Sequence, residues 1–258
     1  MKRIRAWYFF LAALMAVGIV LFSIFVYRWA TEGFAYATHK YPDSRVMPDL
    51  GAALQEQKYE SLRFASVSYE ASPDDPQQIL KIFFTTRQRC TAEVFIQDAL
   101  DIRAVTEQFM AQHPERFEGQ HIYVTLNGWG GGWLHSEYIL FRNYDVDHGA
   151  KVEAGGLGYG YFHVGYADTA LLRDVRGFSG LDLSYFDAPE DLSAFDGMDT
   201  LRFLEFHTGS MGNPLYEIPQ EALDAFTKQH PGCKLSGIKA INEKDDKHEA
   251  ERKGSADL

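Results

Sequence analysis

Cysteine is scarce in this chain: Cys90 and Cys233 are the two cysteines among 258 residues. Two thiols are too few for a disulfide scaffold or for a zinc site built from cysteine alone. Several predicted strands separate the two, and a bridge needs Cα atoms within about 7 Å of each other. We therefore expect two buried free thiols, with a disulfide as the alternative if the two strands pair directly.

Basic side chains are also in deficit. The chain has 25 Lys and Arg against 36 Asp and Glu, which gives a formal charge of −11. An acidic protein repels nucleic-acid phosphates, so we expect no nucleic-acid partner. Hydrophobic residues make up 46% of the chain and charged residues 24%, which is ordinary globular composition and excludes collagen-like, mucin-like and wholly disordered proteins.

Common catalytic motifs are missing as well. The chain has no His-Glu-x-x-His pair and no Gly-x-Ser-x-Gly elbow, and no Gly-Lys-Ser/Thr follows the glycine run at 128–133. That run offers Trp129 and Trp133 as a ligand-presenting loop, the alternative being a glycine turn with core tryptophans. Asp145, Asp147 and His148 are a weak metal candidate, the alternative being solvated loop residues. We expect no cofactor.

The longest uncharged stretch runs from Ala6 to Tyr27 and contains 22 residues. At about 1.5 Å per residue, a helix of this length spans about 33 Å, enough for a hydrocarbon core of about 30 Å. Trp7 and Tyr8 at one end and Trp29 beyond the other fit the aromatic belts of a bilayer. We predict a transmembrane helix over 6–27, in contact with the lipid bilayer.

Flanking charge sets the predicted orientation. Lys2, Arg3 and Arg5 precede the stretch, whereas only Arg28 follows it closely. The positive-inside rule places residues 1–5 in the cytoplasm and the C-terminus outside. We expect an uncleaved signal anchor in the cell membrane, because a signal peptide usually has an apolar core of only about 7 to 15 residues. Cleavage after Ala37 is the alternative.

The remaining chain divides into three parts. We expect a tether over 28–60, one compact α/β domain over 61–241 with α+β as the alternative, and a disordered tail over 242–258. Ten of the 17 tail residues are charged, so the tail cannot bury enough apolar surface to offset its ordering entropy. Short apolar runs predict strands at 61–69, 79–85, 92–96, 121–126, 138–144, 181–185, 203–207 and 234–238.

Helical periodicity predicts helices over 98–112 and 219–229, each ending at a His-Pro pair because the residue before proline avoids helical geometry. A third helix is predicted over 189–195, with Asp187 and Glu190 spaced as a capping box. Strands that alternate with helices predict parallel pairing in part of the sheet. The Gly- and Tyr-rich stretch 138–166 instead predicts antiparallel strands.

Residues 180–238 resemble degenerate bacterial leucine-rich-repeat units. The resemblance lies in Leu181-Asp-Leu183, Leu201-Arg-Phe-Leu-Glu-Phe206 and His230-Pro-Gly-Cys-Lys-Leu235. Expected strand starts near 181, 203 and 234 are irregularly spaced, and the asparagine that the family uses at each bend is missing. We therefore expect repeat-like βα units inside a compact domain. The resemblance implies a protein-binding surface and no catalysis.

Taken together, these features predict a single-pass membrane-anchored protein with an extracytoplasmic interaction or structural module and a protein partner. The alternative is an anchored enzyme, a hydrolase, with its site near the Gly-Trp loop and 145–148.

Overall fold

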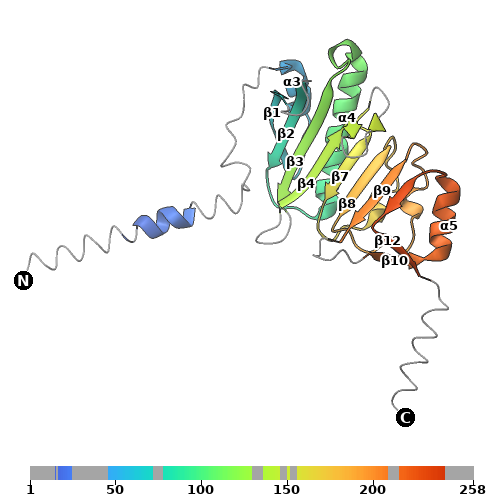
Figure 1. The fold of residues 1–258 in the computed structure, drawn as a ribbon. Helices are drawn as coiled ribbons and strands as arrows, with labels where there is room; N and C mark the ends of the chain where they lie inside the picture. Colours follow the sequence, from blue (N-terminus) through green and yellow to red (C-terminus); the bar gives the residue numbers. More distant parts are fainter. Residues whose placement is uncertain are drawn as a thin grey trace, which may run out of the picture.

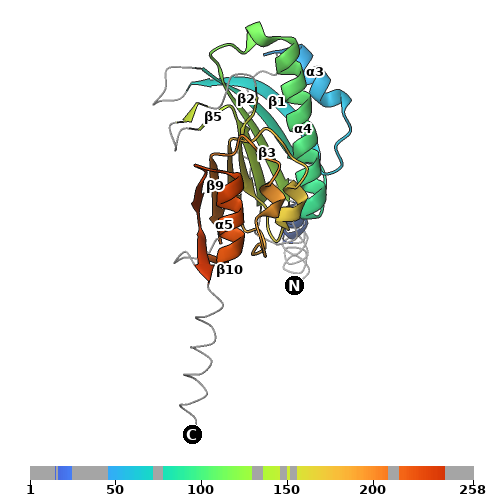
Figure 2. The same ribbon diagram turned by 90° about the vertical axis from the view of Figure 1, so that its right-hand side faces the viewer.

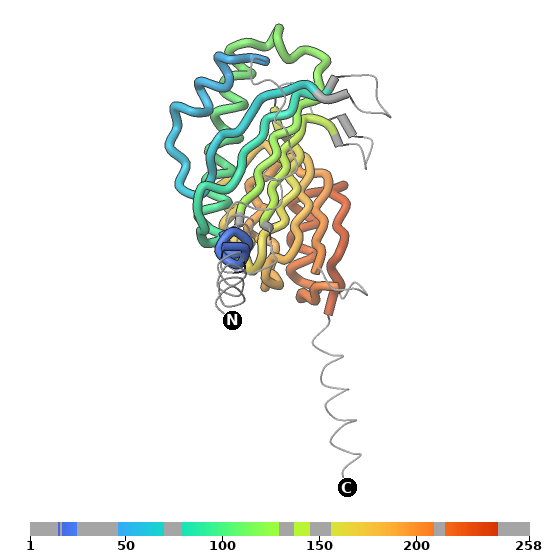
Figure 3. The backbone as a smooth tube through the Cα atoms, turned by 90° about the vertical axis from the view of Figure 1, so that its left-hand side faces the viewer, coloured from blue at the N-terminus to red at the C-terminus, as the bar shows by residue number. Residues whose placement is uncertain are grey.

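The computed structural model describes residue 15 and residues 17–24, 46–71, 78–129, 136–145, 150–151, 156–208 and 215–241. Their main feature is an eight-stranded sheet with the order β1-β2-β3-β4-β7-β8-β9-β11 (Figure 1). The strands are β1 (Leu62–Ala71), β2 (Gln78–Thr86), β3 (His121–Trp129), β4 (Ser136–Arg142), β7 (Tyr159–His163), β8 (Gly180–Ser184), β9 (Phe203–His207) and β11 (Lys234–Ser236). Strands follow one another across this sheet in chain order, as the colours of Figure 3 show.

Strand direction makes the sheet mixed. The pairings β1–β2, β3–β4 and β4–β7 are antiparallel, and β2–β3 is parallel. The last four strands, β7, β8, β9 and β11, form a continuous parallel ladder. The expected mixed α/β sheet is therefore confirmed, as are the parallel pairing of its later part and the antiparallel pairing within 138–166.

Two smaller sheets accompany the large one. Strand β10 (Tyr216–Pro219) pairs in parallel with β12 (Ile238–Ile241), and β5 (Tyr144–Asp145) pairs with β6 (Ala150–Lys151). Gly237 divides the predicted strand 234–238 into β11 and β12. Its φ is +78°, and a Cβ there would lie 1.9 Å from the Phe206 carbonyl oxygen. Only glycine can therefore make this bend.

The described helices within 46–241 cover one face of the sheet (Figure 2). They are α3 (Pro48–Glu56), α4 (Ala92–Gln112), α5 (Gln220–Gln229) and the short 3₁₀ turns η1 (Pro114–Arg116), η2 (Thr169–Leu172) and η3 (Ser193–Phe195). The predicted helices 98–112 and 219–229 are confirmed as parts of α4 and α5.

The predicted strand at 92–96 is wrong, because these residues form the first turns of α4. Thr91 caps the helix, its side chain accepting a hydrogen bond from the Val94 amide at 3.5 Å. Phe95, Ala99 and Ile102 are fully buried at helical spacing. The short apolar run is thus one face of a helix and not a strand.

In place of the predicted helix at 189–195, the structure has the three-residue turn η3. Asp187 and Glu190 form no capping box; instead the Asp191 carboxylate accepts a hydrogen bond from the Ser193 amide at 2.9 Å. Asp in this position favours a local turn over a continuing helix.

The folded domain starts earlier than residue 61. Leu50 and Leu54 of α3 are fully buried in the core, so the last part of the predicted tether belongs to the domain. Asp98 of α4 fixes the chain between α3 and β1, because its carboxylate accepts hydrogen bonds from the Ser61 amide at 2.6 Å and the Leu62 amide at 3.2 Å.

The core lies between the helices and the inner face of the sheet. One row across six strands contains Val124, Phe141, Gly160, Leu181, Leu204 and Leu235, in register from β3 to β11. Phe195 of η3 packs against Phe206 of the next row with ring centroids 6.1 Å apart. Inward-facing positions of adjacent strands thus form continuous apolar rows, as expected for a sheet with one covered face.

Little of the predicted transmembrane stretch is described. Residues 17–24 are helical and exposed. Among the described ranges, none of the helices has both the length and the apolar character needed to cross a bilayer. Apart from residue 15, the rest of 6–27 lies outside the described residues, as do the Ala37 cleavage position and the charged tail 242–258.

Candidate functional site on the uncovered sheet face

The sheet face opposite the helices carries polar and aromatic side chains. We call it the uncovered face, because none of the described helices lies on it (Figure 2). Strand register places Leu140, Tyr161, Asp182, Glu205 and Ser236 in one row on this face. The alternation of strand side chains thus separates an apolar inner face from a polar outer one.

Aromatic side chains gather at the carboxyl ends of β7 and β8. The Tyr161 hydroxyl lies 3.3 Å from His163 Nδ1, and the Tyr185 ring packs against the His163 ring at 4.6 Å. Tyr185 has a φ of +65°, a left-handed conformation that is unusual for an aromatic residue. Strained backbone of this kind persists only where the surrounding structure holds it, and such positions cluster at functional sites.

Three metal-ligating side chains meet beside these rings. His207 Nε2 of β9 lies 3.2 Å from Asp182 Oδ1 of β8 and 3.8 Å from Glu205 Oε1 of β9. One donor atom from each residue lies within 4.8 Å of the others. The parallel β8–β9 register pairs Asp182 with Glu205, and the next outward position of β9 is His207. We call these three residues the Asp-Glu-His cluster.

The charges of the Asp-Glu-His cluster do not cancel, because it contains two carboxylates and one imidazole. Burial raises the pKa of Asp182, and the Glu205 carboxylate raises it further, whereas His207 opposes the shift. Asp182 Oδ1 is buried and accepts no hydrogen bond. Ser236 Oγ donates a hydrogen bond to Glu205 Oε1 at 2.9 Å and so orients that carboxylate. Two carboxylates and one imidazole nitrogen this close together are donors that a single cation can share.

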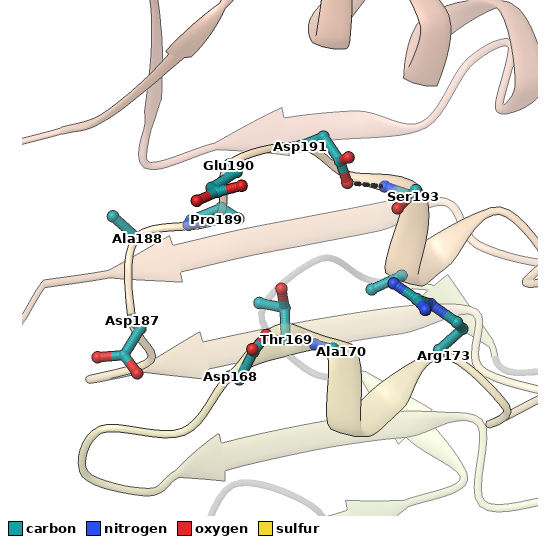
Figure 4. Close-up of a pocket in the computed structure, with 11 residues that line it drawn as sticks. Asp168, Thr169, Ala170, Arg173, Asp187, Ala188, Pro189, Glu190, Asp191 and Ser193 are labelled. Carbon is teal, nitrogen blue, oxygen red and sulfur yellow. Dashed lines mark hydrogen bonds between the residues drawn. The ribbon is translucent and has the colours of Figure 1, made fainter.

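A hollow lies on the helical side, between the loops that follow β7 and β8 (Figure 4). It has a volume of about 290 Å³ and is lined by Asp168, Asp187, Glu190, Asp191 and Arg173. Two of these carboxylates complete local turns, since Asp168 accepts a hydrogen bond from the Ala170 amide and Asp191 from the Ser193 amide. Turn geometry therefore explains Asp168 and Asp191.

The loop residues singled out from the sequence lie at the limits of the described ranges or outside them. Trp129 is the last residue of β3 and Asp145 belongs to β5, but the structure describes only their backbones. Trp133, Asp147 and His148 lie outside the described residues. The loop and metal hypotheses based on these five residues stay predictions.

The two cysteines are free, as expected, and half-buried. Cys90 lies just after β2 and Cys233 just before β11, so most of the sheet separates them. Burial raises the pKa of each thiol to about 11. Both thiols are therefore protonated and weakly nucleophilic near neutral pH.

Comparison with protein-family models, curated proteins and solved structures found no match to this chain. The functional assignment therefore depends on geometry. The sequence analysis missed Asp182, Glu205 and His207, although each is a polar residue next to buried apolar ones in a correctly predicted strand. Pairing Leu181 with Leu204 on adjacent parallel strands would have predicted that Asp182, Glu205 and His207 lie close together.

Proposed function

We propose that the protein is a single-pass membrane-anchored binding module whose folded domain lies outside the cytoplasm. The 22 uncharged residues at 6–27 and the basic side chains before them support the anchor and its orientation. The helical residues 17–24 support it as well, because their apolar side chains are exposed instead of packed in the core.

The uncovered face is the observation that carries the binding role. One row on it contains Lys81 and Lys234 on either side of the buried Arg142, and the neighbouring row contains Asp182 and Glu205. From β2 to β11 this face crosses six strand spacings of about 4.8 Å, about 29 Å in all. A footprint of this width with charges of both signs suits a protein surface with complementary rows of charge.

Its composition supports the same partner class. Lys234 is exposed and lies 5.5 Å from the ring centroid of the half-buried Phe203, whereas Arg142 and the Tyr159 ring that it stacks on at 4.3 Å are buried within the chain. Aromatic side chains such as Phe203 are enriched at the centres of protein interfaces. The likeness of 180–238 to leucine-rich-repeat units also stays a proposal, and it agrees with a protein-binding surface.

Reporter fusions test the anchor. We expect a reporter that is active only outside the cytoplasm, such as alkaline phosphatase, to be active when fused at the C-terminus of the full chain. A reporter active only in the cytoplasm should be silent there. Replacement of Val20 and Leu21, two exposed residues of the 17–24 helix, by arginine should release the chain from the membrane fraction. Cytoplasmic activity at the C-terminus would contradict the proposed orientation.

Site-directed photocrosslinking in intact cells of the native host tests whether a partner protein binds the uncovered face. A benzoylphenylalanine at the half-exposed Phe203 should give a discrete crosslinked protein band, whereas the same residue at the exposed Lys228 of α5 should give none. Leu140→Arg, on the same face, should abolish the band, and Ala170→Arg on η2 should leave it unchanged. Equal crosslinking from positions 203 and 228, or a crosslinked band that Leu140→Arg does not remove, would argue against a partner on this face.

A further inference from the structure

We propose that Asp182, Glu205 and His207 bind one divalent transition-metal ion of the zinc class on the uncovered face, where β8 and β9 pair. This inference goes beyond the proposed partner, because metal binding can be measured on the chain alone.

Donor geometry is the first argument. Zinc takes imidazole nitrogen and carboxylate oxygen at about 2.0 to 2.2 Å, so two ligands of one tetrahedral ion lie about 3.4 Å apart. The observed separations of His207 Nε2 from the Asp182 and Glu205 oxygens, 3.2 and 3.8 Å, bracket that value. All three donors lie within 4.8 Å of one another, so side-chain torsions can bring them onto one ion without backbone movement.

The buried oxygen of Asp182 is the second argument. Its Oδ1 faces His207 Nε2 at 3.2 Å without the geometry of a hydrogen bond, and the side chain is only 15% exposed. A carboxylate oxygen in such a place is costly, because burial removes its hydration and one ion-pair contact replaces only part of it. A metal ion would neutralise the two carboxylates and bind this oxygen directly.

Rigidity of the site is the third argument. Asp182 and Glu205 are register partners on adjacent parallel strands, and His207 follows two positions later on the second of them. The Ser236 hydroxyl on β11 holds Glu205 Oε1 at 2.9 Å. Hydrogen bonds to ligating carboxylates orient them, and metal sites on strands are better defined than sites on loops.

The donor set selects the class of metal. Imidazole favours zinc and other first-row transition ions over Mg²⁺ and Ca²⁺, which prefer all-oxygen ligands. Three protein ligands leave at least one coordination position open. The His207 side chain is 41% exposed, so that position faces outward from the sheet. On the proposed function, a side chain of the partner could occupy it.

The test is a metal titration of the full-length chain in detergent after treatment with a chelator. We expect one zinc ion per chain by calorimetry. His207→Ala and Asp182→Asn should each weaken zinc binding by at least about 100-fold, since loss of a ligand exceeds the 10- to 100-fold cost of losing an outer-shell partner. Ser236→Ala should weaken it about tenfold. Cobalt(II) should give visible ligand-field bands that His207→Ala removes.

Asp191→Asn and His113→Ala provide matched controls away from the cluster, and circular dichroism confirms the fold of each variant. Unchanged zinc affinity in His207→Ala, or tighter binding of Mg²⁺ or Ca²⁺ than of zinc, would overturn the proposal. No zinc binding by the folded wild-type chain would also overturn it, and would show that His207 and the two acids form an ion-pair network only. None of these outcomes alters the crosslinking test of the partner.

Discussion

Replacement of Arg103 by methionine is expected to lower the free energy of unfolding by about 3 to 5 kcal/mol, the usual cost of breaking a buried charge pair. The Arg103 side chain is only 7% exposed, and Nη2 lies 3.1 Å from Glu107 Oε1. It also donates hydrogen bonds to the Leu157 carbonyl at 3.1 Å and the Arg176 carbonyl at 2.9 Å. Methionine fills similar volume but leaves these acceptors unpaired.

The position of Arg103 explains why the effect should be global. Its guanidinium stacks on the Phe178 ring at 3.9 Å, so one side chain joins α4 to the segments that precede β7 and β8. Urea denaturation of the full chain in detergent, followed by far-UV circular dichroism, measures the change. Arg116→Met is the control, because its ion pair with Asp49 lies at the surface. An equal loss in both variants would contradict the special role of Arg103.

Replacement of Glu137 by glutamine is expected to stabilise the fold at alkaline pH. Glu137 is 5% exposed, its Oε2 has no hydrogen-bond partner, and burial raises its pKa from 4.5 to about 7. The unfolded chain therefore releases this proton at lower pH than the folded chain, so folding stability should fall as pH rises from about 4.5 to about 7. At 1.4 kcal/mol per pKa unit, the cost at pH 8 is about 3 kcal/mol.

Glutamine carries no charge at any pH and avoids this cost. The variant should therefore exceed the wild type in stability at pH 8, and the difference should vanish near pH 4. Denaturation curves at several pH values check this expectation. Glu190→Gln, which changes an exposed carboxylate, serves as the control. A stability difference that does not vary with pH would contradict the prediction, because it would show that Glu137 has the same pKa in the folded and unfolded chain.

Much of the sheet could be predicted from the sequence, because alternation of apolar and polar residues is a local signal. The strands at Phe203–His207 and Gly180–Ser184 were predicted to within one residue. The stretch 92–96 was misread because five apolar-rich residues fit a strand as well as one helix face. The short strand β10 at Tyr216–Pro219 was missed because its pairing with β12 depends on distant residues.

The Asp-Glu-His cluster could not be predicted for a related reason. Each strand by itself shows only that Asp182 and Glu205 face away from the core. Their proximity depends on parallel pairing in a particular register, which no local pattern specifies. The loop residues that stood out in the sequence did so by residue type alone, a signal that contains no information about what lies beside them.

Agreement between strand order and chain order has a consequence for biogenesis. Because the chain is synthesised from its N-terminus, the strand that each new strand of the large sheet pairs with has already been synthesised. The sheet can therefore be completed by adding one strand at a time. In this sheet no later strand inserts between two earlier ones, so no pair of neighbouring strands has to await a distant segment. At any stage the edge strands of the growing sheet are β1 and the most recent strand.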